Sequence, residues 1–272
     1  MRFSKMHGNG NDFIMIEDFH GLLASEQEDL AKKLCNRNFG IGADGIILVR
    51  KTEKADAEMV IINSDGSYAS MCGNGLRCFV KYVFERGISV KNPLKILTGD
   101  GIKEVAISIK DEEVDSIVVD MGIPSFDPNS IPALLNKPII NEVITANSKE
   151  YTITSLHLGV PHTVVFGKLH DFQIEEGRYL EKHELFPKGT NVDFCEVIDK
   201  NNIKVMTWER GAGPTLACGT GNCASAFAAY RLGLIENEIN VYIKGGHLKV
   251  KIVGDEVFMI GNATFVFDGI LK

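Results

Sequence analysis

Two cysteines, Cys72 and Cys218, lie in the same short motif. Residues 71-MCGNGLRC-78 and 217-ACGTGNC-223 share Cys-Gly-x-Gly, a nearby second cysteine and a following apolar segment. Each copy follows strand-like sequence and a polar turn, which predicts a cysteine at a strand-to-helix turn. The free N–H groups and positive dipole at a helix start lower the pKa of a thiol and can hold an anion. The motif therefore predicts a reactive sulfur beside a carboxylate cradle.

Two such loops acting together could perform chemistry that one loop cannot. A bound amino acid would have its carboxylate between two helix starts and one sulfur on each face of its α-carbon. One thiolate would remove the α-proton and the opposite thiol would return a proton, which is two-base general acid–base catalysis. The helix N–H groups would stabilise the charge that spreads onto the carboxylate. Cys72 and Cys218 are thus the predicted catalytic pair of an amino-acid epimerase or racemase.

Other interpretations of these cysteines fit the sequence less well. A buried thiol is more often a small core residue than a catalytic one, and Cys78 and Cys223 are predicted to be core. The spacings Cys72/Cys78 and Cys218/Cys223 are too wide for the usual zinc knuckle. Neither loop has the Gly-Lys-Ser/Thr of a phosphate-binding P-loop, and no Cys-x-x-Cys redox motif occurs. We expect no metal site.

The elements that position the motifs can be read from periodicity. Helices are predicted over 74–86 and 220–232, each ending at a glycine, and over 26–36, where Ser25 and Glu28 resemble a capping box. A more exposed helix is expected over 171–182. The remaining chain is rich in short Val/Ile segments separated by Gly, Asp or Asn turns, which is typical of antiparallel hairpins. Strands dominate, so the predicted fold class is α+β.

The repeated motif also predicts the domain organisation, because two copies of one local design suggest two similar halves. A boundary is expected near 119–128, where Gly122, Pro124 and Pro128 cluster.

Length and charge limit the class of protein. The chain has 272 residues, of which 44% are hydrophobic and 24% are charged. These values are ordinary for a globular protein of one or two domains. A net charge of −7 argues against nucleic-acid binding, which usually needs a basic face. Residues 1–20 lack a continuous apolar core, and no apolar run approaches membrane-spanning length. We therefore expect a cytoplasmic protein without a nucleic-acid or membrane partner.

The chain resembles the diaminopimelate epimerase family along essentially its whole length. The segments that carry the resemblance are 5-KMHGNGNDF-13, 40-GIGADG-45, 63-NSDGSYASMCGNGLRC-78, 189-GTNVDF-194, 208-WERGAGPTLACGTGNCA-224 and 266-VFDG-269. Together these motifs are highly specific, although no single one would be.

The resemblance implies a fold of two similar domains, each a mixed β-barrel-like sheet around a central helix, with the active site in the inter-domain cleft. The resemblance implies an N-terminal domain of residues 1–118 plus 264–272 and a C-terminal domain of residues 119–263. It implies an isomerase that needs neither pyridoxal phosphate nor a metal, and a homodimer. The expected activity converts LL-diaminopimelate to the meso isomer for lysine and peptidoglycan synthesis.

The resemblance also assigns residues to roles. Cys72 and Cys218 match the family's catalytic cysteines, His162 and Glu209 match positions that tune the thiols, and Phe267 matches a tyrosine at the dimer contact. The positions that match the substrate-binding set are Asn11, Asn63, Gly73, Asn74, Asn191, Glu209, Arg210, Gly219 and Thr220. Arg210 is suited to hold a distal carboxylate bidentately.

Two positions depart from the family pattern. The family usually has Gly-Asn-Pro-His where this chain has 159-GVPH-162, and often has Gln where this chain has Gly45. Loss of polar contacts to the distal end of a substrate can change selectivity. The alternatives are therefore an epimerase or racemase of the same fold for lanthionine, histidine or diaminobutyrate, or a non-catalytic amino-acid-binding protein.

Overall fold

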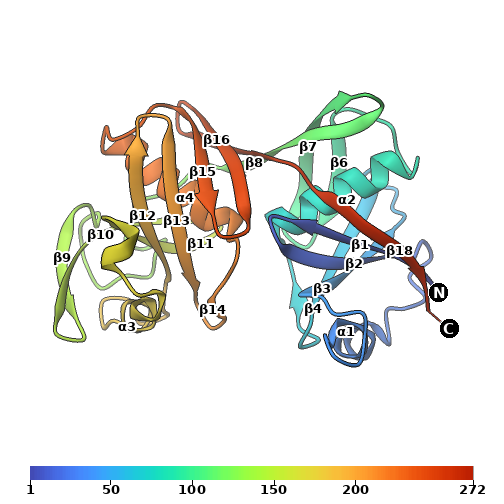
Figure 1. Cartoon of the computed structure of the whole chain (residues 1–272), viewed down its shortest axis with the longest axis horizontal. Coiled ribbons are helices and arrows are strands. Elements are labelled where there is room, and N and C mark those ends of the chain that lie inside the picture. The colour runs from blue at the N-terminus through green and yellow to red at the C-terminus, as the bar shows by residue number, and fades with distance from the viewer. Residues whose placement is uncertain (272) are drawn as a thin grey trace. The chain divides into compact units, whose positions relative to one another are not determined.

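The structure is a computed structural model that describes residues 1–271, and it divides into two compact units. Unit 1 comprises Met1–Val119 and the C-terminal segment from Gly261, and unit 2 comprises Asp120–Ile260. The sequence placed these divisions at 118/119 and 263/264, and Lys272, the last residue of its 264–272 segment, lies outside the described residues. Figure 1 shows strands and one long helix in each unit.

Unit 1 is built on one mixed sheet. Its strands are β1 (Arg2–Gly8), β2 (Asn11–Glu17), β3 (Gly45–Arg50), β4 (Ala57–Asn63), β5 (Tyr68–Ala69), β6 (Leu94–Thr98), β7 (Gly101–Lys110), β8 (Glu113–Gly122) and β18 (Thr264–Ile270). They pair in the order β18-β1-β2-β3-β4-β6-β7-β8, and β5 adds to β4. The pairs β2–β3 and β4–β6 are parallel and the others are antiparallel.

Unit 2 repeats this arrangement. Its strands are β9 (Glu142–Ala146), β10 (Lys149–Leu158), β11 (Val160–Phe166), β12 (Asn191–Asp199), β13 (Asn202–Glu209), β14 (Gly213–Pro214), β15 (Glu238–Ile243), β16 (Gly246–Val253) and β17 (Glu256–Gly261). They pair in the order β9-β10-β11-β12-β13-β15-β16-β17, with β11–β12 and β13–β15 parallel. The two units share one succession of parallel and antiparallel pairs, so the sequence repeat extends to the whole topology.

Each sheet surrounds a helix of its own unit. Helix α2 (Gly73–Glu85) contacts β1, β2, β3 and β4, and helix α4 (Gly219–Arg231) contacts β10, β11, β12, β13, β15 and β16 (Figure 1). Every residue of α2 from Asn74 to Val83 is buried, as expected for a helix enclosed by a sheet. The predicted α+β fold with a central helix in each half is confirmed.

Two local predictions were wrong. Helix α1 (Gln27–Cys35) lies where a helix was expected, but its N-cap is Glu26 and no side chain caps it, so the Ser25 capping box does not form. The segment expected as a helix over 171–182 contains the short turns η1 (Leu169–Asp171) and η2 (Ile174–Glu176) and only a brief α3 (Gly177–Glu181). Apolar packing shapes this second segment, because Leu169, Ile174 and Tyr179 pack against the outer core of unit 2.

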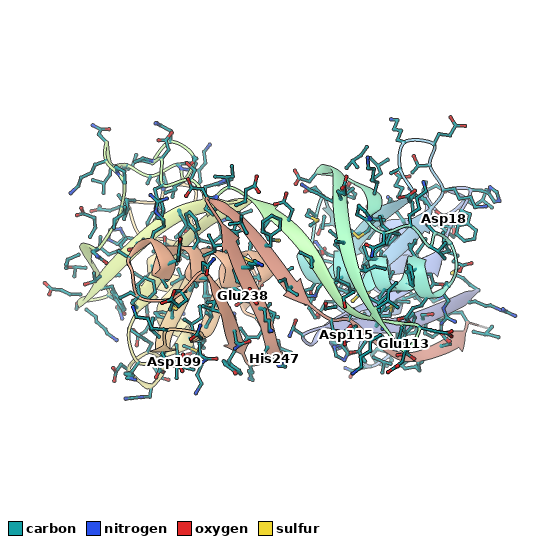
Figure 2. All side chains as sticks on the ribbon, turned by 90° about the horizontal axis from the view of Figure 1, so that it is seen from above. Asp18, Glu113, Asp115, Asp199, Glu238 and His247 are labelled. Carbon is teal, nitrogen blue, oxygen red and sulfur yellow. The ribbon has the colours of Figure 1, made fainter. Side chains whose placement is uncertain are left out.

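The outer face of each sheet has its own apolar core. In unit 1 it includes Ile14, Ile46 and Leu48 beneath Leu34 of α1, and in unit 2 it includes Phe186 and Phe194. Charged side chains such as Glu113 and Asp115 of unit 1, and Asp199 and Glu238 of unit 2, are exposed (Figure 2). Polar groups buried on the helix side of a sheet are therefore exceptions that need a local explanation.

No helix within residues 1–271 is long and apolar enough to cross a membrane.

Candidate active site

Cys72 begins the central helix of unit 1. It is the N-cap of α2, and its Sγ accepts a hydrogen bond from the Gly75 backbone N–H at 3.4 Å. A side chain at position 75 would meet Ile47 Cδ1 at 3.2 Å. Glycine therefore allows the turn to pack closely against β3. Gly73 and Asn74 are the first two helical residues. The predicted strand-to-helix position of this cysteine is confirmed.

Asn11 connects Cys72 to a charged network in unit 1. Its Oδ1 lies 3.5 Å from Cys72 Sγ and accepts a hydrogen bond from Asn74 Nδ2 at 3.3 Å. Its Nδ2 donates to Asp44 Oδ2 at 2.7 Å, and Asp44 in turn pairs with Arg37 at 2.8 Å. Asp44 therefore fixes which end of the Asn11 amide faces the sulfur. Asp44 was not among the site residues predicted from the sequence.

Asn63 has a different local role. Its side chain donates to Ser67 Oγ at 3.0 Å, and its backbone N–H donates to the Ser67 carbonyl at 2.8 Å. These bonds close the turn between β4 and β5, which leads to the Cys72 loop. Asn63 therefore stabilises the turn that precedes the Cys72 loop.

Cys218 occupies the equivalent position in unit 2. It is the N-cap of α4, its Sγ accepts from the Gly221 N–H at 3.4 Å, and it lies 3.4 Å from Thr220 Oγ1. Gly219 and Thr220 are the first two residues of the helix. As in unit 1, the cysteine, the helix start and its exposed N–H groups form one local structure.

The surroundings of Cys218 alter its acidity. Burial raises the pKa of this thiol well above 9.0, and the negative charges of Glu209 and Asp193 raise it further. Hydrogen bonds from Thr220 and Gly221 lower it, but by less. The low thiol pKa predicted for a helix start is therefore wrong for Cys218, because desolvation and two carboxylates outweigh the helix terminus.

His162 lies on β11 with no exposed surface. Its Nδ1 is 2.8 Å from Asp193 Oδ2 on β12, and Asp193 Oδ1 accepts a hydrogen bond from Thr207 of β13 at 2.6 Å. His162 Nε2 has no hydrogen-bond partner among the described residues. Neither Asp193 nor Thr207 was identified from the sequence, although Asp193 stands between Val192 and Phe194 in a buried strand, where a carboxylate is unusual.

Asn191 and Arg210 are linked on neighbouring strand ends. Asn191 Oδ1 accepts from the Arg210 backbone N–H at 2.7 Å. The Arg210 guanidinium donates to the carbonyls of Lys188 at 3.0 Å and Gly189 at 3.4 Å. These two acceptors are neutral, so the guanidinium retains capacity for an anion. Glu209, the preceding residue, acts electrostatically on Cys218.

The two departures from the family pattern have definite places. Val160 is the first residue of β11 and pairs with Leu158 across a turn in which Gly159 has a φ of +71°. Gly45 is the buried first residue of β3, and a Cβ there would lie 2.7 Å from the Ile62 carbonyl oxygen. A glutamine at position 45 would therefore require the backbone of β3 or β4 to move.

Cys218 also lines a pocket of about 480 Å³ inside unit 2. The pocket is formed by β13, β15 and the segment before α4, and its walls include Val205, Leu216, Ile243 and the two lysines Lys204 and Lys244. Small molecules therefore have room beside this segment.

Within residues 1–271, no group of three or more His, Cys, Asp or Glu side chains is placed to hold a metal ion.

Phe267 lies on β18, far along the chain from the cysteines. It is 48% exposed and packs edge-to-face on Phe3, with ring centroids 5.9 Å apart. Val266 and Ile270 of the same strand are 53% and 71% exposed. Phe267 is thus part of an exposed apolar segment of β18.

Some of the predicted residues gather around the cysteine of their own unit. In unit 1, Asn11 and Asn74 lie beside Cys72. In unit 2, Thr220 and Glu209 act on Cys218, together with Asp193, which was not predicted.

Comparisons with known proteins agree on one family. The family model for diaminopimelate epimerase matches residues 3–126 and 154–266. A curated diaminopimelate epimerase of Clostridium perfringens is 57% identical over 269 residues, covering 99% of this chain and 98% of its own length. Curated proteins of the same name from Brachyspira hyodysenteriae and Methanocaldococcus jannaschii are 44% and 39% identical, and cover 99% and 98% of this chain and 98% and 97% of their own lengths.

Solved structures share the fold at low identity. A hydroxyproline epimerase from Agrobacterium vitis has a TM-score of 0.72 at 16% identity, with coverage of 99% of this chain and 90% of that chain. A PhzF-family protein from Bacillus anthracis has a TM-score of 0.71 at 16% identity, with coverage of 100% and 99%.

Proposed function

The chain belongs to the diaminopimelate epimerase family, and on that premise we propose that it interconverts LL- and meso-2,6-diaminopimelate. This activity would supply precursors for lysine and peptidoglycan. The observation that carries the proposal is the pair of cysteines, Cys72 and Cys218, each the N-cap of the central helix of its unit. A two-base proton transfer requires one proton acceptor and one proton donor, and these two sulfurs would supply them.

The α-carboxylate of the substrate would rest on the first N–H groups of the two helices. Gly73 and Asn74 of α2, with Gly219 and Thr220 of α4, supply these positions. Removal of the α-proton places negative charge on the carboxylate, where N–H donors and helix dipoles stabilise it. The same groups that bind the substrate therefore lower the barrier.

The raised pKa of Cys218 suits it to begin as the thiol. In the direction in which Cys218 starts protonated, the Cys72 thiolate takes the α-proton from one face of the carbon. The Cys218 S–H bond then breaks and its proton goes to the other face. The enzyme is left with the thiol on Cys72 and the thiolate on Cys218, which is the starting state of the reverse reaction.

Residues of unit 2 would recognise the distal end of the substrate. Arg210 has capacity for an anion, since its guanidinium donates to carbonyl oxygens, and it would pair with the distal carboxylate. Asn191 orients the Arg210 backbone, and Glu209 would pair with the distal ammonium. Asn11 and Asn63 would complete the site from unit 1.

Lanthionine is a second candidate substrate. Val160 stands where the family has an asparagine, so one polar contact to the distal end is missing. Lanthionine carries the same terminal carboxylates and ammonium groups as diaminopimelate, so Arg210 would bind either molecule.

The test is exchange of the α-proton in heavy water. Purified enzyme should incorporate deuterium into LL-diaminopimelate without added pyridoxal phosphate, and faster than into meso-lanthionine. Cys72→Ala and Cys218→Ala should each reduce turnover on the order of 1,000-fold or more, because each removes one proton carrier. Cys35→Ala, a buried cysteine of the outer core of unit 1, is the matched control and should retain activity. Turnover retained in either test variant would overturn the two-cysteine mechanism.

The same family membership supports two further proposals. The enzyme would act in the cytoplasm, where amino-acid precursors are made. It would be a homodimer, with Phe267 and its exposed neighbours on β18 at the contact between protomers.

A further inference from the structure

Asp193 is a buried carboxylate whose two hydrogen-bond partners come from two neighbouring strands. It has no exposed surface and lies on β12. Its two oxygens engage His162 of β11 at 2.8 Å and Thr207 of β13 at 2.6 Å. Among the described residues, its ionic partner is His162 rather than a lysine or arginine. These two hydrogen-bond donors offset the free-energy cost of burying the carboxylate.

The contact with Asp193 determines the protonation pattern of the His162 ring. A carboxylate oxygen accepts hydrogen bonds, so the ring nitrogen that faces it carries the proton. That nitrogen is Nδ1, which leaves the lone pair on Nε2. Nε2 is buried and has no hydrogen-bond partner among the described residues. The ring therefore presents an available basic nitrogen that is held in one orientation.

Asp193 also touches the helix start that carries Cys218. A Cβ on Gly221 would collide with Asp193 Oδ1, so the carboxylate lies directly against this glycine. The N–H of the same glycine donates to Cys218 Sγ at 3.4 Å. Asp193 thus contacts the turn that holds the sulfur, and its charge acts on that sulfur across a buried, weakly screened distance.

We propose that Asp193 is a positioning residue of this active site, which holds His162 as the Nδ1–H form and places its negative charge against the turn that holds Cys218. The inference rests on the proposed function and extends it, since it assigns a role to Asp193.

The pH dependence of this group involves neighbours on several elements. Burial and the nearby His162 lower the pKa of His157 of β10, and the negative charge of Asp193 raises the pKa of Cys195 of β12. The negative charges of Glu209 and Asp193 both raise the pKa of Cys218 at the start of α4. Burial raises the pKa of Cys195 beyond the range of ordinary thiols, so Cys195 stays protonated at working pH.

The substitution Asp193→Asn tests the role of the charge with little change in shape. The asparagine amide can donate to Nδ1, which moves the proton of His162 to Nε2. We expect ¹⁵N spectra of histidine-labelled enzyme to show His162 as Nδ1–H in the wild type and as Nε2–H in the variant. We also expect kcat to fall on the order of 100-fold with KM changed less than about threefold. Alkylation of Cys218 near pH 8 should become faster, because a nearby negative charge is lost.

Glu196→Gln is the matched control. It removes a carboxylate from the same strand, but Glu196 pairs with Lys168 at the surface. This variant should retain kcat, the His162 tautomer and the Cys218 alkylation rate. A purely structural role for Asp193 would change stability without changing the tautomer or the alkylation rate.

The outcomes separate this inference from the proposed function. Nε2–H on wild-type His162 would overturn the inference even if the enzyme epimerises diaminopimelate, and this spectrum does not require that the variant folds. A folded Asp193→Asn enzyme with wild-type kcat would also overturn it. Absence of deuterium exchange in the wild type would instead contradict the proposed function and leave the tautomer result interpretable.

Discussion

At the scale of single residues, the two cysteines differ in their surroundings although they occupy the same local structure. Both cap a helix and both accept an N–H from the glycine three positions on. Cys72 is only partly buried and faces the amide of Asn11, whereas Cys218 is 7% exposed and lies in the field of two carboxylates. The same cap can therefore place a thiol in different electrostatic surroundings.

The raised pKa of Cys218 predicts slow alkylation at neutral pH. Because only the thiolate reacts and its pKa lies well above 9.0, the rate should rise about tenfold per pH unit from pH 7 to pH 9 without a plateau. Iodoacetamide labelling with peptide mass spectrometry measures this rate, and the pocket beside Cys218 gives the reagent access. Cys218→Ser identifies the labelled peptide. A plateau below pH 8 would show that the helix terminus dominates after all.

At the scale of elements, the fixed position of α2 is what places Cys72. Lys81 and Glu85 form an ion pair within the last turns of α2, with Nζ 2.6 Å from Oε1. Both side chains of this pair also bond to the backbone of β8. Lys81 also donates to the Val114 carbonyl at 3.0 Å, and Glu85 accepts from the Val114 N–H at 2.9 Å. The helix is thus tied to the sheet by charge-assisted bonds as well as by apolar packing.

Lys81→Met should destabilise the fold, because it keeps the length of the side chain but leaves the partly buried Glu85 without its cation. The Lys81 and Glu85 side chains are 8% and 18% exposed. For a partly buried pair, the expected loss is about 2 kcal/mol in the free energy of unfolding. Urea denaturation followed by circular dichroism measures it.

Lys95→Met is the control for this variant. The Lys95–Glu104 pair is 3.8 Å long, and the Lys95 side chain is 60% exposed. Loss of such an exposed pair should cost less than about 1 kcal/mol. Equal losses in both variants would contradict the role assigned to the buried pair.

At the scale of the whole molecule, two copies of one topology are joined in a single chain. The C-terminal strand β18 returns to unit 1 and pairs with β1, so both ends of the chain belong to the same unit. Three apolar residues of β18 are about half exposed or more, namely Val266, Phe267 and Ile270. Exposed apolar residues gathered on one strand are a feature of protein–protein contacts.

The proposed homodimer predicts a particle of twice the 29.9 kDa chain mass. Phe267→Glu should shift the particle towards the monomer, because a charge would be buried at the contact without a partner. Light scattering coupled to size-exclusion chromatography measures the mass. Leu22→Glu replaces another exposed apolar residue of unit 1, which is 80% exposed, and should leave the mass unchanged. A monomeric wild type at micromolar concentration would exclude the dimer.

The sequence alone determined the features that depend on neighbours along the chain. The Cys-Gly-x-Gly motifs predicted both helix starts, because capping is decided within a few residues, and the repeat predicted two similar halves. The Ser25 cap failed although its pattern was present, since the helix starts one residue past the expected position and no side chain caps it.

Only the tertiary structure decided what depends on residues far apart in the chain. Asp193 meets His162 across 31 positions, and a Cβ at Gly45 would collide with the Ile62 carbonyl of the next strand. The raised pKa of Cys218 follows from burial and from the charges of Glu209 on β13 and Asp193 on β12. Desolvation and Coulomb energy depend on distance in space, and a sequence states only distance along the chain.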